Sequence, residues 1–436
     1  MRPFQDNTPT TIPYSSESKV LRLVANQQIK DLLEDNPELL VFPQCLDDCE
    51  DALKEQYILS LHESVDAHDE RLMHVQPTNI VGYFGIGNTN ISIISRFSDA
   101  GGLDKDYFLY YLLQKALSIN LFDLEHSLSQ DDQVFDFLLF LFPTFFKQAL
   151  AQGLYKEYRR YARNDSNVKG RIDLNRHLNL NIPFCGKVAY QSREISYDNS
   201  VTELIRHTIE YLRTKAIGRS LLSADPDICD YVRQIDAATP SYSKKDRTKI
   251  IRANLKPTKH PYFTKYRPLQ NLCVRILRHE SIKYGEDNNR IHGILFDMSW
   301  LWEEYLAKLL PDFKHPQNRK GLGKIYLGEH GALERYPDFY EDKSGGIVLD
   351  AKYKKSIDRN DEHQVIAYMY RLQSRYGGFL MPRTSVEVSN PIHLKGYGQS
   401  LGKLFLVIPQ GAESYDAFCS AILQSECEFE QTVASI

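Results

Sequence analysis

The sequence predicts a mixed α+β protein in three parts: a small N-terminal β-barrel-like domain with a helical insertion (1–153), a basic middle region (154–288) and a C-terminal α/β domain (289–436). The length of 436 residues is too great for one ordinary hydrophobic core. Short strand patterns fill the first hundred residues, whereas strands and helices alternate in the last block. Hydrophobic residues make up 42% and charged residues 25%, as in soluble globular chains, which excludes a disordered or fibrous protein.

Charge is unevenly distributed along the chain. Residues 1–150 hold 10 Lys and Arg against 23 Asp and Glu, whereas residues 151–290 hold 27 against 15. The basic block suits a phosphate backbone, and the acidic block, which phosphate would repel, suits a protein partner. The alternative that the sequence leaves open is that the two blocks neutralise each other within one fold.

The first part begins with a polar segment, 1–18, which we expect to be a loose arm, and a short helix over 27–33. Strands that form a barrel or half-barrel are predicted at 39–43, 56–62, 71–76, 79–87 and 90–97. Gly85–Asn88 predicts a hairpin turn, since a dinucleotide-binding loop would need a following helix. Apolar residues three and four apart predict helices over 106–117 and 133–158.

Features of localisation are few. The apolar stretch Val134–Phe146 is shorter than the roughly 20 residues that cross a bilayer, so a buried helix is the favoured interpretation. The first ten residues lack the basic-then-apolar pattern of a signal peptide. The seven cysteines are scattered, and Cys45 and Cys49 do not form a C-x-x-C pair. We therefore expect reduced thiols in a cytoplasmic protein without membrane contact.

The middle part predicts basic strands at 154–165 and 168–181, a strand at 187–196 and a helix over 199–212 capped by Asn199 or Ser200. Basic loops at 244–252 and 256–268 precede a helix over 262–284. The loop at 256–268 interleaves aromatic with basic residues and is equally compatible with a nucleic-acid clamp and a solvated loop. The candidate DNA-binding residues are Arg159, Arg160, Lys169, Arg171, Lys256, Lys259 and Lys265.

The last part alternates helices and strands, which predicts a mixed sheet with helices on its faces. The predicted elements are a helix at 296–310, strands at 324–327, 334–340 and 347–353, a helix at 363–376, a strand at 378–381 or 403–408, and a C-terminal helix.

The strongest chemical pattern is Tyr336-Pro337-Asp338 followed by the run 347–354, IVLDAKYK. Asp350 and Lys352 are two apart in a strand, so they share a face, and a hairpin at 341–346 brings Asp338 beside them. Two carboxylates suit an oxygen-preferring ion such as Mg²⁺, which polarises a phosphoryl oxygen and lowers the pKa of bound water. The ammonium group can orient or deprotonate that water.

A structural interpretation of this pattern has to be weighed. Pro-Asp and Asp-x-Lys are each common, and either alone would be read as an ordinary strand feature. Their joint occurrence on adjacent strands, next to an apolar run, favours the metal site, because a charged pair beside a buried run needs a reason.

These words are the signature of PD-(D/E)xK nucleases, and with their flanking segments they resemble the McrC family, the nuclease subunits of McrBC-type modification-dependent restriction systems. The resemblance rests on FDMSWLWEEYLAKLL (296–310), YPDF (336–339), VLDAKYK (348–354) and HQVIAYMYR (363–371). The segments 168–184 and 193–209 resemble the family's middle region. A weaker similarity joins NISIISRFSD (90–99) and DYFLYYLLQKAL (106–117) to a partner-binding region in one branch of the family.

The resemblance implies a PD-(D/E)xK restriction-endonuclease-like domain and a Mg²⁺-dependent DNA endonuclease in which Mn²⁺ can substitute. Asp338, Asp350 and the Ala351 carbonyl would hold the metal, and Lys352 would position the attacking water. Glu303 would support a ligand water or a second ion. Gln364, followed by Tyr368, would contact the water or a phosphate, or serve only to complete a hydrogen-bond network.

The resemblance also implies partners: double-stranded DNA and a McrB-like AAA+ GTPase ring, whose GTP hydrolysis the family stimulates. The sequence has no G-x-x-x-x-G-K-[ST] motif, so a nucleotide-driven step would reside in the partner. Two other hypotheses remain at this stage: a non-catalytic assembly subunit that activates a partner NTPase and binds DNA, and an RNA-directed nuclease.

Overall fold

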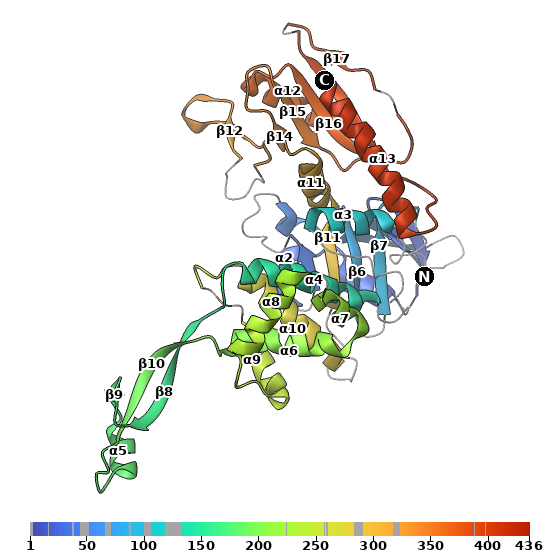
Figure 1. Ribbon diagram of the computed structural model, residues 1–436. Helices are drawn as coiled ribbons and strands as arrows, with labels where there is room; N and C mark the ends of the chain where they lie inside the picture. The colour runs from blue at the N-terminus through green and yellow to red at the C-terminus, as the bar shows by residue number, and fades with distance from the viewer. Residues whose placement is uncertain are drawn as a thin grey trace. The chain divides into compact units, whose positions relative to one another are not determined.

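The computed structural model divides into two compact units, Met1–Val134 with Asp287–Ile436 (unit 1) and Phe135–Glu286 (unit 2). The three-part division predicted above is a different partition and stays a prediction. The residues that the structure describes are 3–15, 17–36, 39–43, 52–65, 71–86, 89–99, 106–117, 133–223, 225–256, 258, 260–282, 291–316, 323–387, 389–396 and 398–436. Figure 1 labels the elements of both units.

The N-terminal strands of unit 1 form two open sheets, so the predicted barrel is wrong. One sheet has the order β1-β7-β6-β11-β3 and the other the order β2-β5-β4, and among the described residues neither closes on itself. The elements are β1 (Phe4–Gln5), β2 (Thr10–Pro13), α1 (Ser18–Val24), α2 (Ile29–Asp35), β3 (Leu39–Phe42), the 3-10 turn Ala52–Glu55, β4 (Leu59–Val65), β5 (Arg71–Pro77), β6 (Ile80–Ile86), β7 (Thr89–Ile94) and α3 (Tyr107–Leu117). The expected loose arm at 1–18 thus contains two paired strands, β1 with β7 and β2 with β5.

A strand that the sequence did not predict, β11 (Ile291–Asp297), joins this N-terminal sheet. It pairs antiparallel with β6 and parallel with β3. The close approach to β6 depends on Gly82, where a Cβ would lie 2.1 Å from the Ile294 carbonyl oxygen and where φ is +129°. The N-terminal sheet is therefore complete only with a strand from the start of the C-terminal block.

The second large sheet of unit 1 has the order β14-β15-β16-β18-β17, in which β15, β16 and β18 run parallel. Helix α12 packs on β15 and β16, and α13 packs on β18. Gly377 permits the packing of α12, because a Cβ there would lie 2.3 Å from the sulfur of Met369. The elements are α11 (Met298–Leu309), β12 (Ile325–Tyr326), the 3-10 turn Glu329–Gly331, β13 (Glu334–Arg335), β14 (Phe339–Tyr340), β15 (Ile347–Ala351), α12 (Arg359–Leu372), β16 (Tyr376–Arg383), β17 (Ile392–His393), β18 (Ser400–Val407) and α13 (Tyr415–Ala434).

This arrangement bears on the C-terminal predictions. The helix predicted at 296–310 begins at Met298 instead, since residues 296 and 297 complete β11. Both alternatives offered for the strand after α12 exist, as β16 and β18. The fold is mixed α/β, as the sequence predicts.

Unit 2 combines a group of helices with a long two-stranded arm (Figure 1). Its elements are α4 (Gln133–Leu150), β8 (Glu157–Asp165), β9 (Arg171–Ile172), α5 (Leu174–Leu180), β10 (Val188–Ser196), α6 (Ser200–Thr214), α7 (Ala216–Ser223), α8 (Pro226–Ala238), the 3-10 turn Lys244–Asp246, α9 (Arg247–Ala253) and α10 (Tyr266–Ile282). β8 and β10 pair along nine residues each, and β9 adds to β10. Residues 168–181 therefore hold a short strand and a helix in place of the predicted strand, and 244–252 is largely helical where a loop was expected.

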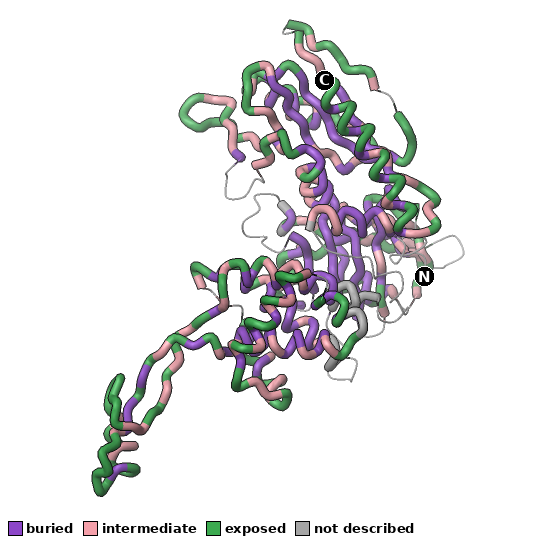
Figure 2. Tube along the Cα trace, viewed as in Figure 1, coloured by how far each residue is buried: buried purple, intermediate pink, exposed green. Residues whose placement is uncertain are grey.

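The tip of the arm is poorly covered, as the exposed colour of this part in Figure 2 shows. Helix α5 has no buried residue. Apolar side chains that are more than half exposed here are Leu174, Leu178, Leu180, Ile182 and Phe184. The arm is held by its strand pairing more than by a hydrophobic core.

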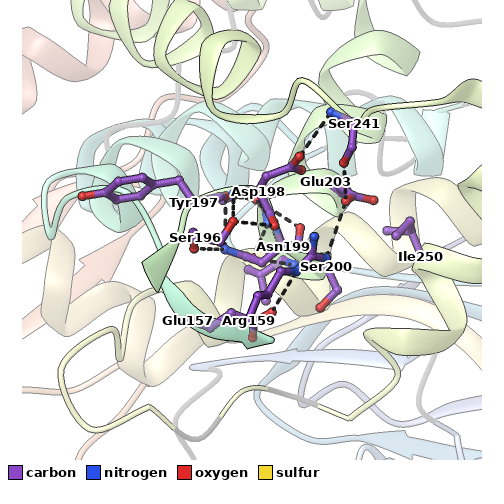
Figure 3. Close-up of polar contacts among 12 residues, drawn as sticks. Glu157, Arg159, Ser196, Tyr197, Asp198, Asn199, Ser200, Glu203, Ser241 and Ile250 are labelled. Carbon is purple, nitrogen blue, oxygen red and sulfur yellow. Dashed lines mark hydrogen bonds and ion pairs between the residues drawn. The ribbon is translucent and has the colours of Figure 1, made fainter. Parts of the chain in front are cut away.

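The junction between arm and helices is a buried polar network (Figure 3). Asn199 is fully buried and caps α6: its side-chain oxygen accepts from the N–H groups of Val201 and Thr202. Its amide nitrogen donates to the Tyr155 carbonyl at 3.1 Å, which ties the cap to the segment before β8. Of the two predicted caps, the structure uses Asn199.

The remaining predictions about the chain are simple to place. The five described cysteines, including the buried Cys273, are free thiols, whereas Cys45 and Cys49 lie outside the described residues. The stretch 134–146 is part of α4, and its described side chains from Leu139 to Phe142 are buried. None of the described helices combines the length and apolar character needed to span a membrane.

One buried carboxylate joins three helices of unit 1, which yields a stability prediction. Glu426 of α13 accepts hydrogen bonds of 2.7 Å from the hydroxyls of Tyr111 on α3 and Tyr305 on α11. We expect Glu426→Ala to destabilise unit 1 by about 3 kcal/mol, because two buried hydroxyls lose their acceptor. Glu426→Gln is the matched control, since its amide oxygen can still accept both bonds. Thermal unfolding checks this, and equal melting temperatures for the two variants would contradict it.

Candidate active site

The hairpin of β14 and β15 brings the two acidic residues of the motif together. Phe339 pairs with Leu349 in the antiparallel register, so Asp338, one residue before β14, lies opposite Asp350. The register follows from the buried apolar run that begins β15, which fixes the strand between β14 and β16. Asp338 itself stands just outside the strand in which the sequence placed it.

Both carboxylates are withdrawn from water. Asp350 is 1% exposed, and Asp338 Oδ2 accepts a hydrogen bond of 2.7 Å from the Ala351 N–H. Burial raises the pKa of Asp338 well above its usual range, and the charges of Asp350 and Glu303 raise it further. Burial also raises the pKa of Asp350, although Lys352 opposes this effect. A site with this much unfavourable negative charge is suited to a cation.

Lys352 supplies one cation from the same strand edge. Its Nζ lies 2.7 Å from Asp350 Oδ2, as expected for residues two apart on one face. It also lies 3.1 Å from the Gln364 side-chain oxygen. Burial by itself lowers the pKa of Lys352, but the Asp350 carboxylate reverses this and the net pKa is raised. Lys352 is therefore an ammonium ion at neutral pH.

Helix α12 supports the lysine through a chain of hydrogen bonds. The Gln364 amide nitrogen donates to the Tyr368 hydroxyl at 2.5 Å, and this hydroxyl donates to the Tyr336 carbonyl at 2.9 Å. The capping box of Asp358 and Asp361 fixes the start of the helix and thereby the height of Gln364. The structure thus links Gln364 to Lys352 and to the strand that leads to Asp338.

Glu303, on α11, approaches the pair from another element. Its Oε1 lies 3.7 Å from Nδ1 of His315, and this ring stacks on Phe339 at 4.7 Å between centroids. The His315 ring nitrogen Nδ1 also lies 3.0 Å from the Asp338 carbonyl oxygen. Glu303 is therefore near Asp338, whose pKa its charge raises, and its support of a ligand water or a second ion stays a prediction.

Sequence reasoning missed two residues of the site. Asp361 is 5% exposed and lies 3.3 Å from Lys352 Nζ and 2.9 Å from Lys354 Nζ. Its signal was available, because Asp361, Gln364 and Tyr368 follow one another at helical spacing on one face. His315 had no such signal, since it lies in a loop after α11 far from the motif in sequence.

The donor set fits an oxygen-preferring ion. Asp350 Oδ2 is buried and accepts no hydrogen bond with good geometry, although the Lys352 ammonium group lies close to it. Two carboxylates and the Ala351 carbonyl are hard oxygen ligands of the kind that Mg²⁺ prefers. Within the described part of the chain, no three His, Cys, Asp or Glu side chains form a metal-binding group, so any such site depends on backbone oxygen and water.

The predicted DNA-binding residues lie in unit 2. The arm contains Arg159, Arg160 and Arg171, and Lys169 lies between its strands β8 and β9. The segment between α9 and α10 contains Lys256 and Lys265. Lys259 lies outside the described residues. Arg159 faces acidic partners at the arm junction, with its guanidinium 3.8 Å from Glu203 (Figure 3). The acidic motif therefore belongs to unit 1, and the described candidate DNA-binding residues belong to unit 2.

Comparisons with known proteins find solved structures of similar fold. A solved half-complex from the tetradecameric assembly of Thermococcus gammatolerans McrB AAA+ hexamers with bound McrC contains a chain of similar fold. It has a TM-score of 0.53 and 14% identity, over 99% of this chain and 99% of that one. A second match is to the cryo-EM structure of the Thermococcus gammatolerans McrBC complex, with a TM-score of 0.34 and 15% identity, over 71% of this chain and 87% of that one. No curated protein matched.

A family sequence model matches most of the chain. Residues 75–381 match the sequence model of the family described as McrBC 5-methylcytosine restriction system component. This span includes the end of β5, all of unit 2, the two acidic residues, Lys352 and α12. The segment therefore covers both the basic arm and the acidic motif. The chain belongs to the family of McrBC 5-methylcytosine restriction system components.

Proposed function

We propose that this chain is a Mg²⁺-dependent DNA endonuclease subunit that works with a McrB-like AAA+ GTPase ring. The observation that carries the proposal is the meeting of Asp338, Asp350 and Lys352 at one buried edge of the sheet, in a chain of a restriction family. A structural role alone would leave a buried and a half-buried carboxylate side by side, at a cost that apolar residues would avoid.

The site residues divide the work of hydrolysis. Asp338, Asp350 and the Ala351 carbonyl would hold the ion, which when bound polarises a phosphoryl oxygen and lowers the pKa of water. Lys352, as a permanent cation, stabilises negative charge that develops on the phosphate and orients the water. Gln364 keeps the ammonium group in place through its 3.1 Å contact. Water adds to phosphorus and the bond to the 3′ oxygen breaks, which leaves a 3′-hydroxyl, as the family implies.

The partner proposal has support of a different kind. In the similar half-complex from Thermococcus gammatolerans, McrC is bound to McrB AAA+ hexamers. The present chain lacks a phosphate-binding loop of the G-x-x-x-x-G-K-[ST] type, so GTP hydrolysis would be the partner's reaction. We assign the acidic N-terminal third to docking and the basic surface of unit 2 to DNA.

The first prediction concerns the metal site. Asp350→Ala should reduce cleavage of double-stranded DNA by at least about 1,000-fold in Mg²⁺ with the partner and GTP, because an ion ligand is lost. Stimulated GTP hydrolysis should stay within a factor of two. Asp342→Ala is the matched control: Asp342 lies in the same hairpin and its side chain is 68% exposed. Full cutting by Asp350→Ala removes the nuclease proposal. Wild-type protein that stimulates GTP hydrolysis without any cutting favours the assembly-subunit alternative.

A second prediction tests Lys352 as a cation. Lys352→Gln should lower the rate of cleavage by about 100-fold or more, since a charge that stabilises the transition state is removed. Raising the pH should not restore the rate, because the variant lacks a positive charge that no change of pH can supply. Lys343→Gln, at an exposed position that pairs with Glu341, serves as the control. A rate within threefold of wild type for Lys352→Gln would contradict this role.

A third prediction addresses the DNA surface. The triple variant Arg160→Ala, Lys169→Ala and Arg171→Ala should weaken binding to any duplex sequence. The slope of log affinity against log salt should decrease by roughly one for each lost phosphate contact. Arg233→Ala, on α8 with a side chain that is 74% exposed, is the control in the same unit. An unchanged salt slope would place the DNA elsewhere, and tighter binding to matched RNA would favour the RNA hypothesis.

A further inference from the structure

Tyr353, which directly follows Lys352, lies in a pocket formed by Ser95, Arg96 and Phe97, which we call the socket. Tyr353 is 2% exposed, and its hydroxyl lies 2.7 Å from the Ser95 hydroxyl. The Phe97 ring meets the Tyr353 ring edge-on, with 5.1 Å between centroids. Both partners come from the turn that follows β7, more than 250 residues away in the sequence.

Arg96 closes the socket with a charge. Its guanidinium lies over the Tyr353 ring, 4.7 Å from the centroid, and donates a hydrogen bond to the Tyr353 carbonyl. The Arg96 side chain is only 7% exposed, and its counter-ion is the fully buried Asp6, 3.6 Å away. Asp6 Oδ1 also accepts from the Arg96 backbone N–H. The guanidinium is thus held between the Tyr353 carbonyl and a carboxylate just after β1.

The same guanidinium reaches the second element of the candidate active site. It donates to Asn79 Oδ1 at 3.2 Å. Asn79 in turn holds the start of α11: its carbonyl accepts from the Met298 N–H at 2.9 Å and its amide donates to Ser299 Oγ at 3.1 Å. α11 carries Glu303 one turn further on. Arg96 therefore bridges the segment after Lys352 and the helix of Glu303.

The bridge completes the restraints on the chain just after β15, because it acts on the one residue between Lys352 and Lys354. The Lys352 N–H donates to the Leu380 carbonyl at 2.9 Å, which fixes one side of the residue. Its other side continues into Tyr353, whose carbonyl is the one that Arg96 holds. A shift of about 1 Å in a positioned group can cost roughly 100-fold in rate. Arg96 does not contact Asp338, Asp350 or the Lys352 ammonium group in any interaction that the structure records.

We propose that Arg96 is a positioning residue for the proposed cleavage reaction, because it fixes Lys352 through Tyr353 and Glu303 through Asn79. The N-terminal sheet is then part of the catalytic machinery, and anything that displaces the end of β7 changes cleavage without touching the acidic site. This inference rests on the proposed nuclease function.

The experiment compares Arg96→Gln, Arg96→Lys and Tyr353→Phe with wild type in Mg²⁺, DNA, GTP and the McrB-like partner. We expect Arg96→Gln to lower kcat by about 30-fold with KM for DNA and stimulated GTP hydrolysis within a factor of two. Arg96→Lys retains the charge and a donor, so its kcat should be at least about threefold higher than that of Arg96→Gln. Tyr353→Phe, which removes only the bond to Ser95, should lower kcat by about threefold. Arg22→Gln, at an exposed ion pair with Glu63, is the control.

Three outcomes overturn the inference. An unchanged kcat in a folded Arg96→Gln protein shows that the socket is only structural. A parallel loss of cleavage and GTP stimulation in Arg96→Gln and Tyr353→Phe shows a general loss of structure or docking. Hydrogen exchange at the amides of residues 351–354 adds a readout that needs no cutting: it should accelerate by about tenfold in Arg96→Gln. If the wild-type protein does not cut at all, the nuclease proposal fails. Unchanged hydrogen exchange in Arg96→Gln separately refutes the positioning role of Arg96.

Discussion

The buried Asp350 carboxylate, the half-buried Asp338 carboxylate and the Lys352 ammonium group together form the constraint on which the candidate site depends. Two acids cannot share an apolar strand edge unless cations or protons compensate for their charge. Lys352 compensates for part of it, and Gln364 and Asp361 determine where that lysine lies. The hairpin register, the capping box of α12 and the turn after β7 all serve this arrangement. The strain that remains is what a divalent ion would relieve.

Much of the site could be predicted from the sequence, because its chemistry is local. Asp350 lies in β15 and Lys352 directly after it, and a short hairpin adds Asp338, so period-two alternation is enough to bring them together. Gln364 was predicted from the resemblance of residues 363–371 to a helix of the McrC family, in which Tyr368 follows one turn later. Asp361 could have been found by the same spacing. His315 and Arg96 could not, because their contacts depend on how loops from distant parts of unit 1 pack.

The fold was less predictable, because its sheets depend on pairing between strands that are distant in the sequence. The strands at 79–87 and 90–97 were recognised by composition, but their partner β11 starts near residue 290 and no short-range pattern reports such a pairing. A barrel was the simplest way to close the predicted edges, and the chain instead closes one edge with a distant strand. In unit 2, the basic run 168–181 alternates like a strand, yet Asp173 caps a helix there by accepting the Arg176 N–H. Local hydrogen bonding overrode the pattern.

The place of β11 between β6 and β3 also has a consequence for synthesis in the cell. As the chain emerges from the ribosome, β3 and β6 are made early, and all of unit 2 is made before the strand that joins them. At about 5–20 residues per second, the nascent sheet keeps two unpaired edges for roughly ten seconds or longer. Unit 2 can complete its own fold during that interval, because its strands pair only within it. The order of translation thus favours a finished basic arm on a ribosome-bound chain whose acidic motif, Asp338 to Lys352, has not yet been made.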